Sequence, residues 1–212
     1  MTSGTAVRPA GICRGWPDLA LAVCGAGLLV LAALPVNPTR VPDAEAAVFR
    51  VLNGTTVLPF VIVWSVMQLG NFLVVPAAAL VAAAFRMWRL ALELLVAGLG
   101  TYVAAKVVKR VVLRGRPHEL LGDVVIRGAE ARGLGFVSGH AATLAALATV
   151  AWPWLGPRGR ITVGVLVVVV SLTRVYVAAH LPLDVVGGAA LGLAVGGMVR
   201  LVLGRPARAR PA

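Results

Sequence analysis

The chain contains very little charge for its length. Only 13% of its 212 residues are Asp, Glu, Lys or Arg, whereas 59% are hydrophobic, and the mean hydropathy is +0.92. Soluble domains usually carry about a quarter charged residues. This deficit excludes an ordinary water-soluble domain. Most of the length is instead taken up by apolar stretches close to the roughly 20 residues that a membrane-crossing helix needs.

Acids, histidines and cysteines are also scarce. The chain has 8 acidic residues against 20 basic ones, 3 histidines and 2 cysteines. The spacing of Cys13 and Cys24 suits neither a disulfide nor a thiolate metal site. The formal net charge of +12 fits membrane topology and anionic lipid headgroups. Nucleic-acid binding is disfavoured, because the basic residues are divided between the two membrane faces and lack interleaved aromatic residues.

The apolar stretches predict an all-α fold: one polytopic membrane bundle over residues 1–212, with about six transmembrane helices and a short interfacial helix. The helix at the interface is expected over Pro42–Leu52, and Val57–Gln68 is expected to dip into the bilayer. We expect an uncleaved first span, because no clean small-x-small cleavage site follows it. A polar tail is expected over residues 204–212. The expected spans are Leu19–Val36, Leu69–Phe85, Leu90–Leu113, Val137–Leu155, Ile161–Ala179 and Leu181–Leu203.

Three polar patches interrupt this pattern, each at the end of a predicted span. All three histidines of the chain lie in or near these patches. The patches span residues 109–184, and we take them as the core of a phosphate-handling site. They are Lys109-x6-Arg116-Pro117, Ser138-Gly139-His140 and Thr173-Arg174-x5-His180-x3-Asp184.

Each patch has a physical reason to bind phosphate or act on it. Lysine and arginine side chains pair with phosphate oxygens. Ser138 and Gly139 begin a predicted helix, where free backbone N–H groups favour an anion and glycine admits close approach. Arg174 lies within an apolar span, where a charged residue usually marks function. His180 and Asp184 are four residues apart, so the carboxylate can orient the imidazole as a base or nucleophile.

Nearby charged residues are assigned lesser roles. Arg110 and Arg114 are expected to form a basic rim that reaches the headgroup region, and Lys106 is a further candidate to line the cavity. Glu93 is expected to pair with Arg89, four residues earlier on the same helix. His118 is expected to be solvated.

The basic residues also predict the orientation. With a cytoplasmic N-terminus, the inner face carries arginines with few acids, as the positive-inside rule expects. The outer face mixes arginines with acids, and all three patches open there. The inner set is Arg8, Arg14, Arg86, Arg89, Arg158, Arg160, Arg205, Arg208 and Arg210.

In order and spacing, the three patches resemble the motifs of the type 2 phosphatidic acid phosphatase superfamily, which includes lipid phosphatases and vanadium haloperoxidase-like proteins. The resemblance covers about Leu90–Leu203. Two positions depart from the usual pattern: Val137 stands where the family has proline, and Thr173 where it has serine.

The resemblance implies a role for each site residue. His180 would attack phosphorus to form a phosphohistidine, Asp184 would orient it, and His140 would protonate the leaving oxygen and then activate water. No metal or other cofactor is implied. The substrate would be a prenyl or glycerolipid phosphate of the membrane, met at the extracytoplasmic face. The residues implied to hold the phosphoryl oxygens are Lys109, Arg116, Ser138, Gly139 and Arg174.

Three alternatives remain open. His140, His180 and Asp184 could form a three-ligand metal site, although the nearby cations oppose a divalent ion. The same basic cavity could serve a non-catalytic phospholipid carrier or flippase. The same scaffold could also transfer the phosphoryl group to another lipid or a sugar. Whether the substrate is a monophosphate or a diphosphate is open as well, and so is the oligomeric state.

The Arg-, Ala-, Val- and Gly-rich composition hints at a GC-rich bacterial source, and hence at a prenyl carrier phosphate of envelope synthesis.

These assignments predict different outcomes for two histidine substitutions. His180→Ala should abolish phosphate release, because it removes the implied nucleophile, whereas His118→Ala should leave most of it intact. Turnover of a lipid phosphate by the two purified variants measures this. Equal losses in both would mean that the histidine roles are misassigned.

Overall fold

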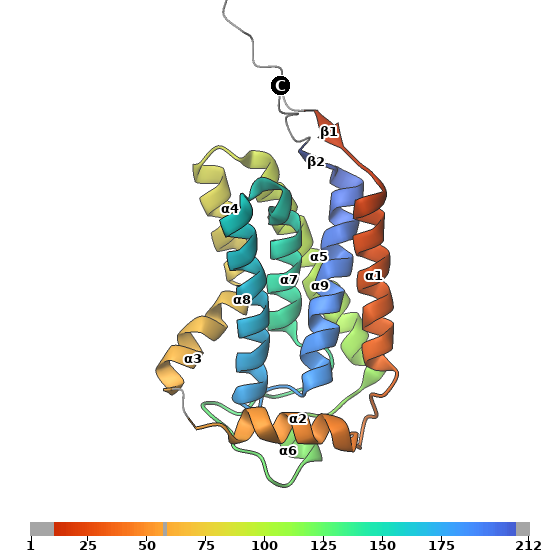
Figure 1. The fold of residues 1–212 in the computed structure, drawn as a ribbon, viewed down its shortest axis with the longest axis vertical. Coiled ribbons are helices and arrows are strands. Elements are labelled where there is room, and N and C mark those ends of the chain that lie inside the picture. Colours follow the sequence, from red (N-terminus) through yellow and green to blue (C-terminus); the bar gives the residue numbers. More distant parts are fainter. Residues whose placement is uncertain (1–10, 57–58, 207–212) are drawn as a thin grey trace, which may run out of the picture.

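The protein is an upright helical bundle that is capped at one end by a transverse helix (Figure 1). The computed structural model describes residues 11–56 and 59–206. The α2 helix (Asp43–Gly54) lies across one end of the bundle, close to the short α6 (Pro117–Leu120), and α3 (Phe60–Met67) leans outward. The upright helices are α1 (Trp16–Ala33), α4 (Val74–Ala84), α5 (Trp88–Val112), α7 (Gly139–Ala151), α8 (Pro157–Tyr176) and α9 (Pro182–Leu203).

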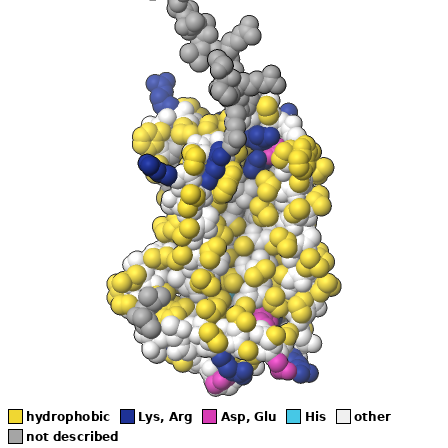
Figure 2. Space-filling model, in the orientation of Figure 1, with side chains coloured by type: hydrophobic (Ala, Val, Ile, Leu, Met, Phe, Trp, Pro, Cys, Tyr) yellow, Lys and Arg dark blue, Asp and Glu magenta, His cyan; other side chains and the backbone are white. Residues whose placement is uncertain are grey.

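The all-α membrane fold predicted from composition is confirmed. Within the described ranges, four helices are long and apolar enough to cross a membrane, or five if a bent pair is counted as one span. Hydrophobic side chains cover the middle of the visible surface (Figure 2). Exposed hydrophobic residues of the bundle include Leu28, Val103 and Val165, which suit contact with lipid tails. The four helices are α1, α5 with its extension to Leu120, α8 and α9.

The fourth expected span is a short central helix. The α7 helix has 13 residues, and a 3-10 turn, η2 (Trp152–Trp154), follows it. At about 1.5 Å per residue, α7 is about 20 Å long, which is less than the roughly 30 Å of a bilayer core. Its residues from Ala141 to Val150 are all buried, so α7 is enclosed by its neighbours.

The second expected span is bent and starts later than the sequence suggests. A 3-10 turn, η1 (Gln68–Gly70), separates α3 from α4, and the two arms differ in direction by 67°. In the turn between the two arms, the Asn71 side chain accepts a bond from the Leu73 N–H at 3.1 Å, just before α4 begins. The predicted start at Leu69 is therefore five residues early. Of the segment expected to dip into the bilayer, Val57 and Leu58 lie outside the described residues.

Glycines on α9 allow α1 and α7 to pack closely on opposite faces. A Cβ at Gly188 or Gly192 would collide with backbone atoms of α7, and one at Gly197 with the backbone of α1. On α1, a Cβ at Gly25 would meet the α9 backbone at Ala190 and Ala194. Small residues at helix contacts permit this close approach, which drives association of helices in lipid.

The two described ends of the chain meet at the end of the bundle opposite α2 (Figure 1). Strand β1 (Ile12–Cys13) pairs antiparallel with β2 (Arg205–Pro206), two short strands that the sequence does not predict. Asp18 is fully buried there and lies 2.6 Å from Arg200 and 3.2 Å from Arg205. These ion pairs join the start of α1 to the end of α9.

The ion pair predicted within α5 is also present at this end. Glu93 accepts a bond from Arg89 Nε at 2.9 Å and a second from the Trp154 indole at 3.0 Å. Glu93 is buried, so both of its oxygens are satisfied by side chains. The prediction that Glu93 has a local structural role is confirmed.

The buried face of the interfacial helix α2 differs from the one that its pattern of apolar residues suggests. Its buried residues are Glu45, Ala46, Phe49 and Asn53, whereas Val48 and Val51 are exposed. The buried face of α2 therefore includes the acid Glu45. The reason is that Glu45 has ionic partners inside the bundle, described below.

The close contact of α1 with α9 predicts opposite effects for two glycine substitutions on one helix. Gly25→Ala should destabilise the protein by about 1–3 kcal/mol through overpacking. Gly27→Ala, two residues later and with open space around its Cβ position, should stabilise the helix by about 0.5–1 kcal/mol. Thermal unfolding of the two variants in detergent checks this. Equal effects would show that α1 is not packed as described.

Candidate active site

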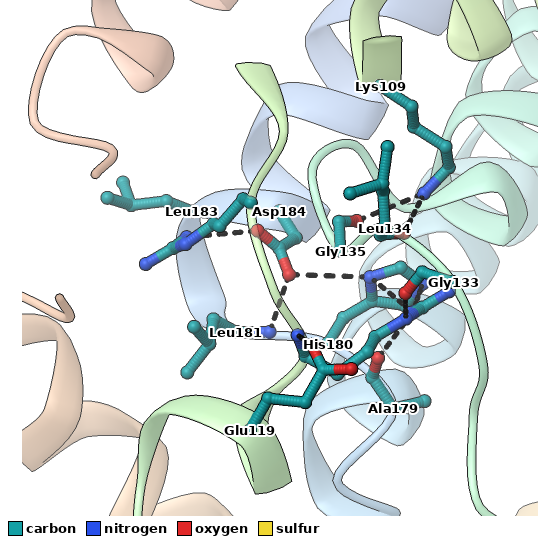
Figure 3. Close-up of polar contacts among 12 residues, drawn as sticks. Lys109, Glu119, Gly133, Leu134, Gly135, Ala179, His180, Leu181, Leu183 and Asp184 are labelled. Carbon is teal, nitrogen blue, oxygen red and sulfur yellow. Dashed lines mark hydrogen bonds and ion pairs between the residues drawn. The ribbon is translucent and has the colours of Figure 1, made fainter. Parts of the chain in front are cut away.

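The three polar patches meet at the end of the bundle covered by α2. Lys109 comes from the last turns of α5, and Arg116 from the loop just before α6. His180 lies in the connection between α8 and α9, and Asp184 in the first turn of α9. In Figure 3, Lys109, His180 and Asp184 surround the loop that carries Gly133, Leu134 and Gly135. The structure thus brings together residues that are up to 75 positions apart in the sequence.

His180 and Asp184 lie side by side (Figure 3). The Nδ1 atom of His180 is 3.4 Å from Oδ2 of Asp184, long for a hydrogen bond but within ion-pair range. Both side chains are almost completely buried. Oδ2 also accepts the Leu181 N–H at 2.9 Å, which fixes the carboxylate against the start of α9. This arrangement favours the tautomer in which Nδ1 carries the proton and Nε2 has a free lone pair.

Arg116 lies against the imidazole, close to both of its nitrogens. Its Nη1 lies 3.0 Å from Nε2 and 3.2 Å from Nδ1 of His180, and it donates to the Ala179 carbonyl at 2.6 Å. Bonds to the Gly133 and Arg132 carbonyls, at 2.8 and 3.0 Å, fix the other guanidinium nitrogens. Because a guanidinium only donates, it can pair with Nε2 when Nδ1 is protonated.

Lys109 reaches the same loop from α5. Its Nζ donates to the carbonyls of Leu134 and Gly135, at 2.6 and 3.2 Å (Figure 3). It lies within electrostatic range of Arg116, Arg174 and Asp184. Lys109 therefore both holds the loop and contributes a positive charge to the cluster.

The Ser138 patch forms the start of α7, as predicted. Ser138 is the N-cap residue, and its N–H donates to the Asp184 backbone carbonyl at 2.8 Å. Its hydroxyl is buried and has no hydrogen-bond partner among the described residues. A Cβ at Gly139 would meet nothing within 4 Å, so open space adjoins the backbone there. An unpaired hydroxyl and free N–H groups beside open space suit an anion.

His140 and Arg174 complete the cluster from α7 and α8. His140 is half-buried and lies within electrostatic range of Arg174 and Arg116. The Arg174 guanidinium contacts the Met67 sulfur at 2.5 Å, and its buried Nε has no hydrogen-bond partner among the described residues. By contrast, the Thr173 hydroxyl donates to the Val170 carbonyl of its own helix.

Arg114 is not the headgroup-facing rim residue that the sequence suggests. Its side chain is completely buried, and it pairs with Glu45 at 2.5 Å and with Asp184 at 2.9 Å. The earlier expectation is wrong because Arg114 has two buried carboxylate partners from distant parts of the chain. Only Arg110 of the two expected rim residues is exposed. Sequence reasoning missed both Arg114 and Glu45, since neither lies at a motif position assigned to the site.

The remaining neighbours lie outside the cluster. The His118 side chain is 20% exposed and its Nε2 is 2.9 Å from Glu130, so it is paired and not freely solvated as expected. Lys106 is exposed and sits over the Tyr102 ring at 4.4 Å. It does not join Lys109 in the cluster.

Burial and fixed cations keep His180 uncharged. Desolvation lowers the pKa of His180 well below its usual value, and the positive charges of Arg116, Arg174 and Lys109 lower the pKa further. A neutral imidazole with an available Nε2 is the form required of a nucleophile.

An apolar groove of about 870 Å³ lies between α1, α7, α8 and α9, and it contains none of the patch residues. We identify the site by its chemistry and not by cavity size. Among residues 11–56 and 59–206, no group of three or more His, Cys, Asp and Glu side chains is placed to hold a metal ion.

Comparison with known proteins identifies the family. A family model described as the PAP2 superfamily matches residues 88–207, which is more than half of the chain. The chain belongs to the PAP2 superfamily. The resemblance predicted from the three patches is confirmed.

A curated PAP2 relative carries a more specific name. Decaprenylphosphoryl-5-phosphoribose phosphatase of Mycobacterium tuberculosis is 38% identical over 126 residues, covering 56% of this chain and 66% of the relative. The matched region thus spans just under two thirds of that protein's length.

Solved PAP2 structures share the fold. LpxE of Aquifex aeolicus superposes with a TM-score of 0.69 at 24% identity, covering 74% of this chain and 95% of LpxE. A transmembrane PAP2-type phosphatidylglycerolphosphate phosphatase of Bacillus subtilis gives a TM-score of 0.66 at 22% identity, covering 85% and 94%. At these identities the likeness concerns the fold alone.

The lowered pKa of His180 predicts the acid limit of the reaction. A depressed pKa leaves the imidazole neutral through pH 6.5 and below, so kcat/KM should fall from protonation of His180 only well under pH 6.5. A pH profile of kcat/KM, with the phosphate ionisation of the substrate measured separately and divided out, checks this. An enzyme ionisation at or above pH 6.5 on the acid side would contradict it.

Proposed function

We propose that this PAP2 phosphatase hydrolyses a lipid phosphate at the extracytoplasmic membrane face, through a phosphohistidine at His180 and without a metal ion. The observation that carries the proposal is the environment of His180. One ring nitrogen faces Asp184 at 3.4 Å, and the other lies 3.0 Å from Arg116. Lys109 and Arg174 add positive charge to the same position. An oriented, neutral imidazole among fixed cations suits attack on a phosphate.

The first step forms one bond and breaks another. His180 Nε2 attacks phosphorus, and the bond from phosphorus to the lipid oxygen breaks. His140 takes up a proton when the anionic phosphate binds beside it, and it gives this proton to the leaving oxygen. On substrate binding, Arg116 shifts its donor from Nε2 to a phosphoryl oxygen, which frees the lone pair for attack.

The second step regenerates the enzyme. Neutral His140 takes a proton from water, and the resulting hydroxide attacks phosphorus and breaks the bond to Nε2. Inorganic phosphate leaves, and His180 returns to its neutral form. The same residue thus acts first as an acid and then as a base.

Fixed donors supply the stabilisation of charge in both steps. Phosphoryl transfer depends mainly on positioning and on neutralising the equatorial oxygens. Lys109, Arg116 and Arg174 supply positive charge, while Ser138 and Gly139 supply a hydroxyl and backbone N–H groups at the start of α7. Donors fixed by the loop carbonyls need no reorganisation when the substrate arrives.

The distribution of charge supports the proposed orientation. Basic side chains gather at the end where the C-terminus emerges, whereas basic and acidic side chains occur together at the α2 end (Figure 2). Positive residues favour the cytoplasmic side. The α2 end, with the active site, therefore faces outward in this proposal. Arg8, Arg208 and Arg210, which belong to the basic set, lie outside the described residues.

The curated relative suggests the class of lipid. Its name specifies a decaprenylphosphoryl sugar that carries a phosphomonoester. A prenyl-linked phosphate also suits a site that opens at the membrane surface beside lipid-facing helices. We therefore favour a prenyl-linked phosphomonoester over a glycerolipid phosphate as the substrate.

Phosphate release in the presence of a chelator tests the proposal. Purified protein in detergent should release phosphate from a prenyl-linked substrate, because fixed cations take the place of a metal. The panel comprises decaprenylphosphoryl-5-phosphoribose, prenyl monophosphate, prenyl diphosphate, phosphatidic acid and phosphatidylglycerol phosphate. His180→Gln should reduce release to background, and His118→Gln serves as the matched control.

Each other outcome favours a specific alternative. Activity lost in chelator and restored by one metal ion would support a metalloenzyme. Binding of the lipids without release would support a carrier or flippase. Loss of the lipid's phosphate only when an alcohol acceptor is added, with the phosphoryl group recovered on that acceptor, would support a phosphotransferase.

A further inference from the structure

We infer that Glu45 and Arg114 are positioning residues that hold the Asp184 carboxylate, and through it the tautomer of His180. The inference deepens the proposed function and rests on the role proposed there for His180. Glu45 lies outside residues 88–207, the part of the chain that matches the PAP2 family model. Nothing in the family match therefore assigns it to the site.

The four side chains form one continuous buried chain of contacts. Glu45 accepts two bonds from Arg114, Oε1 from Nη1 at 3.0 Å and Oε2 from Nη2 at 2.5 Å. Arg114 Nη1 also donates to Asp184 Oδ1 at 2.9 Å. Asp184 in turn faces His180 through its other oxygen. A continuous series of contacts therefore connects α2 with His180, the proposed nucleophile.

The Asp184 carboxylate is fixed at both oxygens. Oδ1 accepts from Arg114, and Oδ2 accepts from the Leu181 N–H at 2.9 Å. These two bonds set the plane of the carboxylate, so Oδ2 can point only toward His180 Nδ1. Without Arg114, the backbone bond alone would leave the carboxylate free to rotate about it.

Glu45 partly neutralises the positive charge that Arg114 presents to Asp184. Alone with Asp184, the guanidinium would neutralise the carboxylate and weaken its hold on the Nδ1 proton. Because Glu45 takes the two-pronged contact and Asp184 a single one, the Glu45–Arg114 pair is close to neutral as a unit. Asp184 then remains a stronger hydrogen-bond acceptor for the imidazole N–H.

Glu45 also fixes the backbone beside the site. Its Oε1 accepts the Leu183 N–H at 2.9 Å, in the first turn of α9. The bonds donated by the N–H groups of Leu181 and Leu183 thus hold the backbone on both sides of Pro182, in the segment that follows His180. Both terminal nitrogens of the buried Arg114 are occupied by Glu45 and Asp184. Both residues therefore act through Asp184.

The tautomer of His180 provides a direct test that does not depend on activity. The chain has only 3 histidines, so ring ¹⁵N signals of labelled protein in detergent can be assigned with His118→Gln and His140→Gln variants. Wild-type protein should show His180 protonated at Nδ1. Glu45→Gln, which keeps the size and an acceptor but removes the charge, should lower the population of this tautomer, and so should Arg114→Lys. Asp43→Asn, at an exposed position of α2, is the matched control and should change nothing.

Kinetics separate positioning from general destabilisation. Glu45→Gln should lower kcat by roughly tenfold or more and leave KM nearly unchanged, since orienting partners of a functional histidine typically contribute on this scale. In an Asp184→Asn background the same substitution should have little further effect, because the group through which it acts is already lost. A merely structural role would produce equal losses in both backgrounds.

An unchanged His180 tautomer in Glu45→Gln, or equal kinetic losses in the two backgrounds, would overturn the inference. The proposed function fails separately, if wild-type protein releases no phosphate from any lipid of the panel. In that case the ¹⁵N comparison still decides whether Glu45 and Arg114 control His180.

Discussion

The buried carboxylate of Asp184 is the contact on which the site depends. It lies in the first turn of α9, where it binds Arg114, the Leu181 N–H and His180, and its backbone carbonyl accepts the N–H of Ser138 at the start of α7. One residue thus connects all three polar patches. Because this carboxylate is buried, leaving it unpaired would destabilise the protein, and the surrounding donors offset that cost.

Close packing of the helices brings the three polar patches together. Glycines along α9 let α1 and α7 approach its backbone, so the start of α7 lies directly against the start of α9. Larger residues at Gly188 or Gly192 would separate Ser138 from Asp184. At the opposite end, Asp18 and Arg200 join α1 to α9 by a buried ion pair. Both ends of α9 are therefore fixed, which gives the site a rigid support.

The sequence predicts the fold and the cluster but not its supporting shell. Apolar runs predict the long helices to within a few residues, because length and hydropathy determine membrane spans locally. Arg114 is misread because a charged residue beside a motif is usually exposed to solvent. Glu45 is missed for the same reason, because it lies on a short amphipathic helix. Their pairing joins positions 69 residues apart, a contact that no local pattern encodes.

Direct detection of the covalent intermediate tests the central proposal most sharply. Protein mixed with a ³²P-labelled lipid phosphate would be quenched within milliseconds in alkaline detergent, which preserves phosphohistidine, and the label mapped by peptide mass spectrometry. We predict transient labelling of His180 that is absent in His180→Gln. Turnover without any labelled histidine, or label on a different residue, would contradict a mechanism in which His180 is the nucleophile.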